Sequence, residues 1–250
     1  MPGYLFSNKE FNDRFIKNTT LKEKNLQELK ILINPYILRR TKSEVIDELP
    51  DKIEKICIVE NTRDQQRIYD GLINEIKENV ESNSYNSAQL FSYLTKLRQI
   101  CIDPAIVLDD YDGGSGKIEF VKKMVNDKSK EHKILIFSQF TSGLKKVEKM
   151  LNEEKIKYFY IDGSVNAKSR LNMVNEFNAN KSVRIFLISL KAGGTGLNLT
   201  SADMVIHLDP WWNPSAEEQA NDRAHRIGQQ KEVEVIKLVA RGTIEEKIIS

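Results

Sequence analysis

Five short apolar runs, separated by segments with helical spacing, limit the folds open to this chain more than any other feature. The runs span residues 134–137, 157–161, 184–189, 204–208 and 233–239. Between most of them, apolar residues recur at the spacing of a helix face, as in Leu144, Val147 and Leu151. Such alternation predicts a parallel sheet with helices covering both faces. We therefore expect residues 116–250 to form one doubly wound α/β domain.

Polar or glycine-rich segments follow four of the predicted strands. They are Ser138-Gln139, Asp162-Gly163-Ser164, the segment from Lys191 to Gly196, and the segment from Asp209 to Asn213. In an open α/β sheet, ligands bind in the crevice beyond the carboxyl ends of the strands. Glycines there let the backbone approach a ligand closely and direct N–H groups towards it. The sequence therefore predicts a binding site along this edge.

The segment after the fourth strand predicts a helix with well-marked ends. Asn213 is a favourable N-cap, Pro214 suits the first helical position, and Gly228 can end the helix. Glutamates in the first turns favour the same start, because they interact with the positive end of the helix dipole. We therefore expect one helix between Asn213 and Gly228.

On such a helix Gln219, Arg223 and Arg226 follow the spacing i, i+4 and i+7, so their side chains project from one face. Two arginines one turn apart repel each other by roughly a few tenths of a kcal/mol. A phosphate or carboxylate bound between them would remove that repulsion. The alternative is a pair of solvated arginines that interact with nearby carboxylates.

Two glycine-rich stretches resemble nucleotide-binding loops but lack the required spacing. In GGSGK, the pattern GxxxxGK[ST] would need a glycine where Tyr111 stands and a serine or threonine where Ile118 stands. The stretch AGGTGLNL does not fit GxGxxG. We therefore expect Gly116 to be a turn residue before a helix, and no Walker A loop in this chain.

Composition excludes several classes of protein. No apolar run approaches the roughly 20 residues needed to cross a bilayer. Cys57 and Cys101 lie far apart and the three histidines show no metal-binding spacing, so neither a disulfide framework nor a metal site is expected. A net charge of +2 does not by itself indicate nucleic-acid binding. We expect a cytoplasmic protein without a membrane partner.

The first hundred residues are expected to lie outside the main domain. Residues 53–60 alternate like a strand, and residues 62–102 predict two helices that form a hairpin or a protruding pair. Arg39, Arg40 and Lys42 form either a solvated charged face or a contact to phosphates or acidic partners. Of the two adjacent tryptophans, Trp211 and Trp212, we expect one in the core and the other able to stack on a base or sugar.

Several motifs together resemble the C-terminal helicase-like lobe of the SNF2 (Swi2/Snf2) family of superfamily 2 ATP-dependent DNA translocases. They are KILIFSQF, YIDGS, LKAGGTGLNLTSAD, DPWWNP and QANDRAHRIGQ, with NPYILRRTKSEV, LPDK, LTKLRQICIDP and SGK upstream. The resemblance covers nearly the whole chain, and DRAHRIGQ with AGGTGLNL is highly specific. It implies a RecA-like (P-loop NTPase-type) sheet with an N-terminal helical protrusion.

The resemblance also implies roles for individual residues. Arg223 and Arg226 are expected to be arginine fingers for the γ-phosphate of ATP, with Gln219 beside them. The loop that senses nucleotide and touches one DNA strand is expected to contain Gly194, Thr195 and Gly196. Lys191, Trp212 and Asn213 are expected to face DNA, and Ser138, Gln139 and Arg170 are expected to contact the tracking strand or to be structural supports. Interlobe contacts are expected from Arg39 and Arg40.

The same resemblance implies a domain order and partners. Residues 1–19 would be the tail of lobe 1 or an interlobe linker, 20–107 the brace and protrusion, 108–115 a linker, and 116–250 lobe 2. Because Walker A and the acidic motif are absent, the ligands of ATP-bound Mg²⁺ are expected on the N-terminal RecA-like lobe of the same protein. The isolated chain is then expected to be inactive. Double-stranded DNA is the expected partner, with a DNA-bound protein as the remodelling target, in a bacterial nucleoid.

One alternative is a DNA- or protein-docking module with vestigial ATP motifs. The intact spacing of Gln219, Arg223 and Arg226 argues against such decay. A second alternative is an α/β enzyme acting on a small molecule. The chain offers no recognisable nucleophile and base pair for that chemistry.

Overall fold

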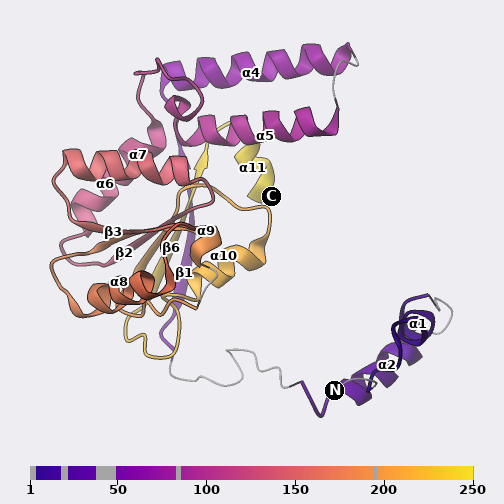
Figure 1. The fold of residues 1–250 in the computed structure, drawn as a ribbon. Coiled ribbons are helices and arrows are strands. Elements are labelled where there is room, and N and C mark those ends of the chain that lie inside the picture. The colour runs from indigo at the N-terminus through magenta and orange to yellow at the C-terminus, as the bar shows by residue number, and fades with distance from the viewer. Residues whose placement is uncertain (1–3, 18–21, 38–48, 83–85, 194–195, 250) are drawn as a thin grey trace. The chain divides into compact units, whose positions relative to one another are not determined.

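The computed structural model describes residues 4–17, 22–37, 49–82, 86–193 and 196–249 of the chain (Figure 1). The chain divides into two units, Met1–Glu48 and Leu49–Ser250. The first contains α1 (Asn8–Phe11), a short π-helix η1 (Asn12–Ile16) and α2 (Lys22–Ile33). Inside this unit the Asn25 side-chain amide donates to the backbone carbonyl of Arg14 over 2.7 Å, which joins α2 to η1.

The second unit is built on a six-stranded parallel sheet in the order β1-β6-β5-β2-β4-β3 (Figure 1). The strands are β1 (Lys52–Val59), β2 (Ile134–Ser138), β3 (Tyr158–Ile161), β4 (Ile185–Ser189), β5 (Met204–His207) and β6 (Val233–Ala240). All five apolar runs of the sequence are therefore strands. The predicted doubly wound parallel sheet, with a helical protrusion, is confirmed.

The sheet begins earlier in the chain than residue 116, where the sequence placed the start of the α/β domain. The strand predicted at residues 53–60 is β1, and it lies at the edge of this sheet beside β6. The pairing runs in register from Lys52 opposite Val233 to Val59 opposite Ala240. Periodicity identifies a strand but not a partner far away in the chain, and for that reason the sequence placed this strand with the protrusion.

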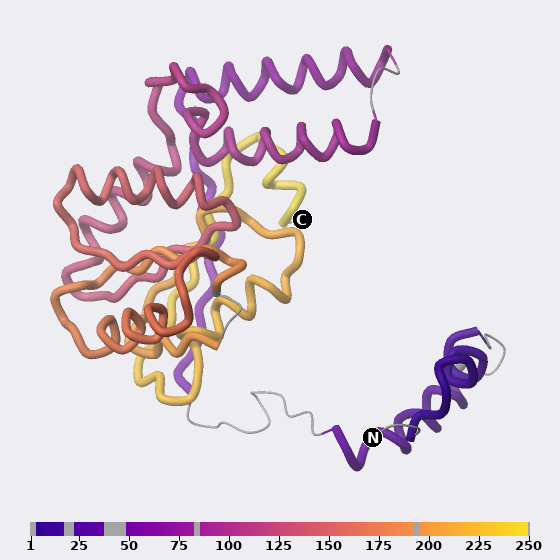
Figure 2. Tube along the Cα trace, viewed as in Figure 1, coloured from indigo at the N-terminus to yellow at the C-terminus, as the bar shows by residue number. Residues whose placement is uncertain are grey.

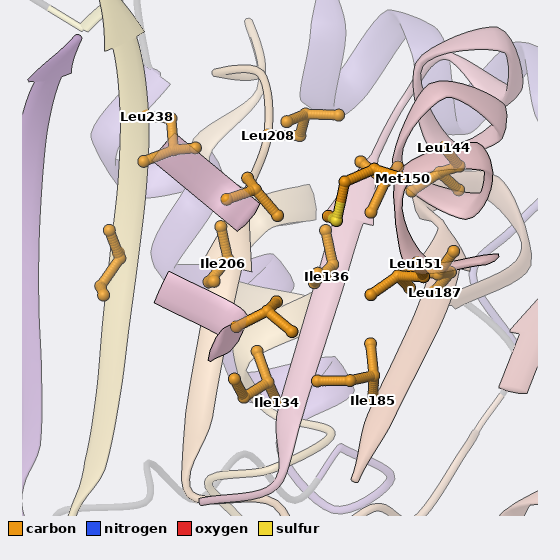
Figure 3. Close-up of a cluster of buried hydrophobic side chains, with 14 of the residues drawn as sticks. Ile134, Ile136, Leu144, Met150, Leu151, Ile185, Leu187, Ile206, Leu208 and Leu238 are labelled. Carbon is orange, nitrogen blue, oxygen red and sulfur yellow. The ribbon is translucent and has the colours of Figure 1, made fainter. Parts of the chain in front are cut away.

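Helices cover both faces of the sheet. On one face lie α6 (Gly116–Lys128) and α7 (Thr141–Glu153), and on the other lie α8 (Ala167–Ala179), α9 (Leu190–Gly193) and α10 (Pro214–Asn221). Side chains of alternate residues of β2 point to opposite faces of the sheet. Ile134 and Ile136 pack in the cluster that Figure 3 shows, and Leu135 and Phe137 pack in the cluster on the opposite face. Each such buried side chain stabilises the fold by about 1.5–3 kcal/mol.

Two long helices, α4 (Arg63–Glu81) and α5 (Ser87–Ile102), form the protrusion and run side by side away from the sheet (Figures 1 and 2). Each begins with a capping box, at Thr62 and at Asn86. The base of the pair packs through Tyr69 and Leu97 against residues near the end of β6 and the start of α11 (Ile244–Ile249). The predicted helical pair is confirmed. None of the described helices is long and apolar enough to cross a membrane.

Gly116 is a structural glycine, as its turn position suggested. A Cβ atom at this position would lie 1.9 Å from the backbone oxygen of Glu60, so no larger residue fits without movement of the backbone. The Gly116 N–H donates over 3.1 Å to the side chain of Gln65, which is fully buried. This close approach joins the start of α6 to the end of β1 and the start of α4.

Candidate functional site

Four of the predicted site segments follow β2, β3, β4 and β5 at the carboxyl edge of the sheet. Asp209, just beyond β5, is fully buried, and this burial raises the pKa of its carboxyl group. The Ser138 hydroxyl donates to Asp209 over 2.5 Å and the Gln139 N–H donates over 3.3 Å, so the end of β2 is tied to the end of β5. Ser138 is itself fully buried and holds Asp209, which is the supporting role that the sequence left open for it.

Arg98 on α5 reaches the same point and was missed by the sequence analysis. Its terminal nitrogen donates to the backbone oxygen of Pro210 over 2.5 Å and lies 3.4 Å from the Asp209 carboxylate. The guanidinium carbon lies 5.3 Å from the ring centroid of Phe140 and 5.6 Å from that of Trp212. Burial lowers the pKa of Arg98, and the charge of Asp209 opposes this effect. The local sequence offered no distinct signal, because Arg98 stands in a mixed stretch of α5 next to Gln99 and two residues after another cation, Lys96.

The turn between β5 and α10 separates its two tryptophans in the way the sequence predicted. Trp211 packs against the core cluster. Its backbone N–H donates to the side chain of Glu217 over 2.7 Å. Trp212 is 55% exposed. Asn213 caps α10, and its side chain accepts from the Ser215 N–H over 3.0 Å. The turn therefore packs one partly buried indole against the core and exposes the other.

The prediction that one helix runs from Pro214 to Gly228 is wrong. α10 ends at Asn221, and the next residues form tight turns in which Arg223 N–H donates to Ala220 and Ala224 N–H donates to Asn221. Gln219, Arg223 and Arg226 therefore do not share one helical face.

Beyond α10, other parts of the chain use the backbone carbonyl groups of Arg223 and Ala224, which a longer helix would need. The Leu199 N–H donates to the Arg223 oxygen over 2.9 Å. The Gln229 side-chain amide donates to the Ala224 oxygen over 3.1 Å and to the Ala202 oxygen over 2.7 Å. In a continuous helix these carbonyls would accept from N–H groups four residues later. The segment after the glycine loop thus holds the arginine segment in a non-helical form.

The two arginines remain neighbours outside the helix, but they differ in exposure. Arg223 is 7% exposed, and its Nε atom is buried without a hydrogen-bond partner. Burial lowers the pKa of Arg223, and the charge of Arg226 lowers it further. A guanidinium group stays protonated despite such shifts. Arg226 is exposed, next to Gly228, whose φ of +99° favours glycine.

The other predicted site residues lie at separate places. Gln219 is exposed and lines a shallow depression of about 600 Å³ over α10, together with Asn213 and Asp222. Lys191 is exposed on α9, and Gly196 follows with a φ of +55°. Four predicted residues lie outside the described part of the chain, namely Gly194, Thr195, Arg39 and Arg40.

Arg170 on α8 supports the loop that follows β3. Its Nε donates to the Val165 oxygen over 2.7 Å, and a terminal nitrogen donates to the Asp162 oxygen over 3.1 Å. The same side chain lines a cavity of about 370 Å³ together with Leu171 and Gly196. Arg170 is thus bonded to the loop after β3 and shares a cavity with Gly196 of the loop after β4.

A third buried cation, Lys117 on α6, lies behind the site. Its ammonium group pairs with Glu245 over 2.7 Å and donates to the backbone oxygens of Leu208 and Leu238 over 2.7 and 3.1 Å. Both charged side chains are fully buried. Burial raises the pKa of Glu245, and the charge of Lys117 opposes that rise. The pair joins α6 and α11 to the ends of β5 and β6, directly before Asp209.

Two family models match this chain. The model described as "Helicase conserved C-terminal domain" matches residues 116–228, and the model described as "SNF2-related domain" matches residues 1–106. Among curated relatives, the "Uncharacterized ATP-dependent helicase MG018" of Mycoplasma genitalium is 37% identical over 253 residues. That match covers 99% of this chain and 24% of the relative. The chain therefore spans about a quarter of the length of that relative.

Solved structures agree with these matches. The "SWI2/SNF2 ATPase core in complex with dsDNA" of Sulfolobus solfataricus is 35% identical, with a TM-score of 0.68, over 99% of this chain and 54% of that chain. The "SWI2/SNF2 ATPase C-terminal domain" of the same organism is 32% identical, with a TM-score of 0.67, over 80% of this chain and 84% of that chain. Because sequence and fold agree over most of both chains, this protein belongs to the SNF2 family and contains its C-terminal helicase lobe.

Proposed function

We propose that this chain is the second motor lobe of an ATP-dependent translocase on double-stranded DNA. In this proposal Arg223 and Arg226 act on the γ-phosphate of an ATP molecule that the N-terminal lobe holds. Membership of the SNF2 family supports the reaction class. The solved complex of a related core with double-stranded DNA supports the choice of DNA.

The single observation that carries the proposal is the buried, unpartnered Nε atom of Arg223 beside Arg226. A buried donor without a partner is costly, and a like charge next to it adds to that cost. An anion with several acceptor oxygens would satisfy both guanidinium groups. Planar guanidinium groups suit a transferring phosphoryl group, since they stabilise the charge spread over its oxygens.

Mg²⁺ and ATP fit this arrangement only if another lobe supplies the metal ligands. Within the described ranges, no group of three or more histidine, cysteine or carboxylate side chains could hold a metal ion. Bound ATP would supply the phosphoanhydride bond that is cleaved. The contribution of this chain would be to bind and orient the terminal phosphate through Arg223 and Arg226, with Gln219 on the nearby α10.

DNA contacts are proposed for exposed side chains that follow β4 and β5. Lys191 and Asn213 are exposed, and the half-exposed Trp212 offers a ring on which a base or sugar can stack. Gln139 and the loop of Gly194, Thr195 and Gly196 would complete this surface, with Arg170 as its support. Arg39 and Arg40 are proposed to contact the N-terminal lobe. A protein bound to DNA in the bacterial nucleoid would be the target of translocation.

The test uses the full-length protein that contains this chain. Arg226→Ala should lower DNA-stimulated ATP hydrolysis by about 10³ to 10⁵ in rate, because it removes charge stabilisation at the phosphoryl group. DNA affinity at fixed salt should change little. Arg241→Ala is the matched control, since Arg241 is an exposed arginine that pairs with Glu60.

Two results would contradict the proposal. One is unchanged hydrolysis in Arg226→Ala, and the other is DNA-stimulated turnover by residues 1–250 alone. Unchanged hydrolysis together with salt-dependent DNA binding would favour the docking module. In that case log affinity should fall against log salt by about 0.9 for each phosphate neutralised.

A further inference from the structure

We propose that Arg98 is a positioning residue that fixes the turn of residues 209–213 to the helical protrusion and holds the indole of Trp212 in one orientation. The inference rests on the proposed function in one respect, namely that DNA is the ligand of that turn. The immobilisation of Trp212 is a property of the free protein, and it can be measured without DNA.

Arg98 contacts two consecutive residues just beyond β5, namely Asp209 and Pro210. Its terminal nitrogen donates to the Pro210 oxygen and faces Asp209, whose carboxylate also accepts from the end of β2. The side chain is 5% exposed, so water does not compete for these contacts. The guanidinium group therefore joins α5 of the protrusion to the edge of the sheet where the predicted DNA contacts lie.

The same guanidinium group lies between two aromatic rings. Phe140 precedes α7, and Trp212 belongs to the turn, with centroids 5.3 and 5.6 Å from the guanidinium carbon. A planar cation can stack on an aromatic ring and hydrogen-bond along its own edge at the same time, which an ammonium group cannot do. Arg98 thus uses its plane on the rings and its edge on Pro210 and Asp209.

The orientation of the Trp212 side chain depends on Arg98 more than the orientations of Trp211 and Asn213 do. Trp211 and Asn213 are held by hydrogen bonds to Glu217 and Ser215. Within the described residues, Arg98 is the one cation close to the Trp212 ring, and no aromatic ring stacks on it. An exposed indole that is already oriented loses less conformational freedom when a base or sugar stacks on it. Arg98 would therefore raise DNA affinity without touching DNA.

The experiment uses the 250-residue chain with Trp211→Phe, so that Trp212 is its one tryptophan. A related C-terminal domain has been solved by itself, which supports the use of this chain alone. We compare Arg98→Lys with Arg67→Lys, because Arg67 is an exposed arginine of the protrusion that pairs with Asp64. Arg98→Lys should leave the thermal midpoint of unfolding within a few degrees. Because the guanidinium group no longer stacks on the indole, the fluorescence anisotropy of Trp212 should fall, and its quenching by acrylamide should rise about twofold. Arg67→Lys should change neither signal.

DNA binding provides the second measurement. Arg98→Lys should weaken binding to a short duplex about tenfold, in line with the loss of one stacked ring. The slope of log affinity against log salt should stay the same, because no phosphate contact is removed. A merely structural role would leave Trp212 as mobile as before. Binding by neither parent nor variant would contradict the DNA proposal, and the anisotropy of the free protein would still decide the role of Arg98.

Phe140→Leu keeps the test decisive if Arg98→Lys does not fold. This variant keeps Arg98 and its hydrogen bond to Pro210 but removes the ring on the far side of the guanidinium group. It should increase the quenching of Trp212 to a smaller extent than Arg98→Lys. Unchanged anisotropy and quenching of Trp212 in whichever of the two variants folds would overturn the positioning role.

Discussion

Two buried arginines near the carboxyl edge of the sheet differ in how completely the chain surrounds them. Arg98 faces the carboxylate of Asp209, donates to Pro210 and lies between two rings. Arg223 is buried to a similar degree, and the Nε atoms of both arginines lack a hydrogen-bond partner, but the stronger charge acting on Arg223 is another arginine, Arg226, which Asp222 only partly offsets. The first charge is neutralised by the protein itself. The second indicates a ligand or partner that this chain does not contain, since buried charges are normally paired.

Lys117 extends this comparison, because it is a third buried cation and has the most complete set of partners. Replacing it with methionine should lower the free energy of unfolding by about 3–5 kcal/mol, since Glu245 is then left buried without its cation. Urea denaturation measures this change. Lys117→Met with Glu245→Leu should recover part of the loss, because the second change removes the stranded carboxylate. A single variant as stable as the parent would mean that the pair contributes nothing.

Arg98→Met and Arg223→Met test the comparison directly, because they make the same change at two buried arginines. Arg98→Met should lower the free energy of unfolding by roughly 2 to 4 kcal/mol, since Asp209 keeps Ser138 and Gln139 but loses its charged partner. Arg223→Met should change it by less than about 1 kcal/mol, because no paired group is left behind. The same urea experiment measures both. Equal losses at the two positions would show that the distinction is wrong.

The smallest expected effect concerns His207, the last residue of β5, whose side chain contacts the end of α10. It is fully buried, and its Nε2 lies 2.8 Å from Asn221 Oδ1. Burial lowers the pKa of His207 below its ordinary value. Below about pH 6.5 the unfolded chain therefore binds a proton that the folded protein does not. Stability should fall with falling pH, by up to about 1.4 kcal/mol per unit for this group.

His207→Gln isolates that contribution, because glutamine keeps a hydrogen-bond donor but does not titrate. The variant should lose stability less steeply than the parent between pH 6.5 and 5, as measured by urea denaturation at each pH. Carboxylates affect both proteins alike, so the difference between the two curves reports the histidine. Parallel curves would mean that His207 takes up a proton equally well in the folded protein.

Local patterns in the sequence predicted much of the fold. The runs that became β2 to β6 are apolar on both faces, as strands between two helical layers must be, and the helices between them repeat at helical spacing. The binding edge follows from the same pattern, because polar and glycine-rich residues follow the strands. Asn213 and Pro214 correctly predicted where α10 begins, since capping depends on neighbouring residues.

Failures of the sequence analysis have one physical cause, which is contact between residues far apart in the chain. The chain does not continue as a helix beyond α10, where Leu199 and Gln229 use the carbonyl groups of Arg223 and Ala224. No residue within the helix signals this, and Gly228 offered a plausible end further on. Arg98 was missed for the same reason, as its partners lie more than a hundred residues away.

The sequence by itself determined the sheet, its binding edge and the presence of two arginines in the segment after β5, because these depend on spacing and local propensity. Only the tertiary structure decided the environment of each charge. It paired Arg98 with Asp209 and Lys117 with Glu245, and it buried Arg223 beside the like charge of Arg226. The energy of a buried charge depends on what surrounds it, and those surroundings come from distant strands and helices.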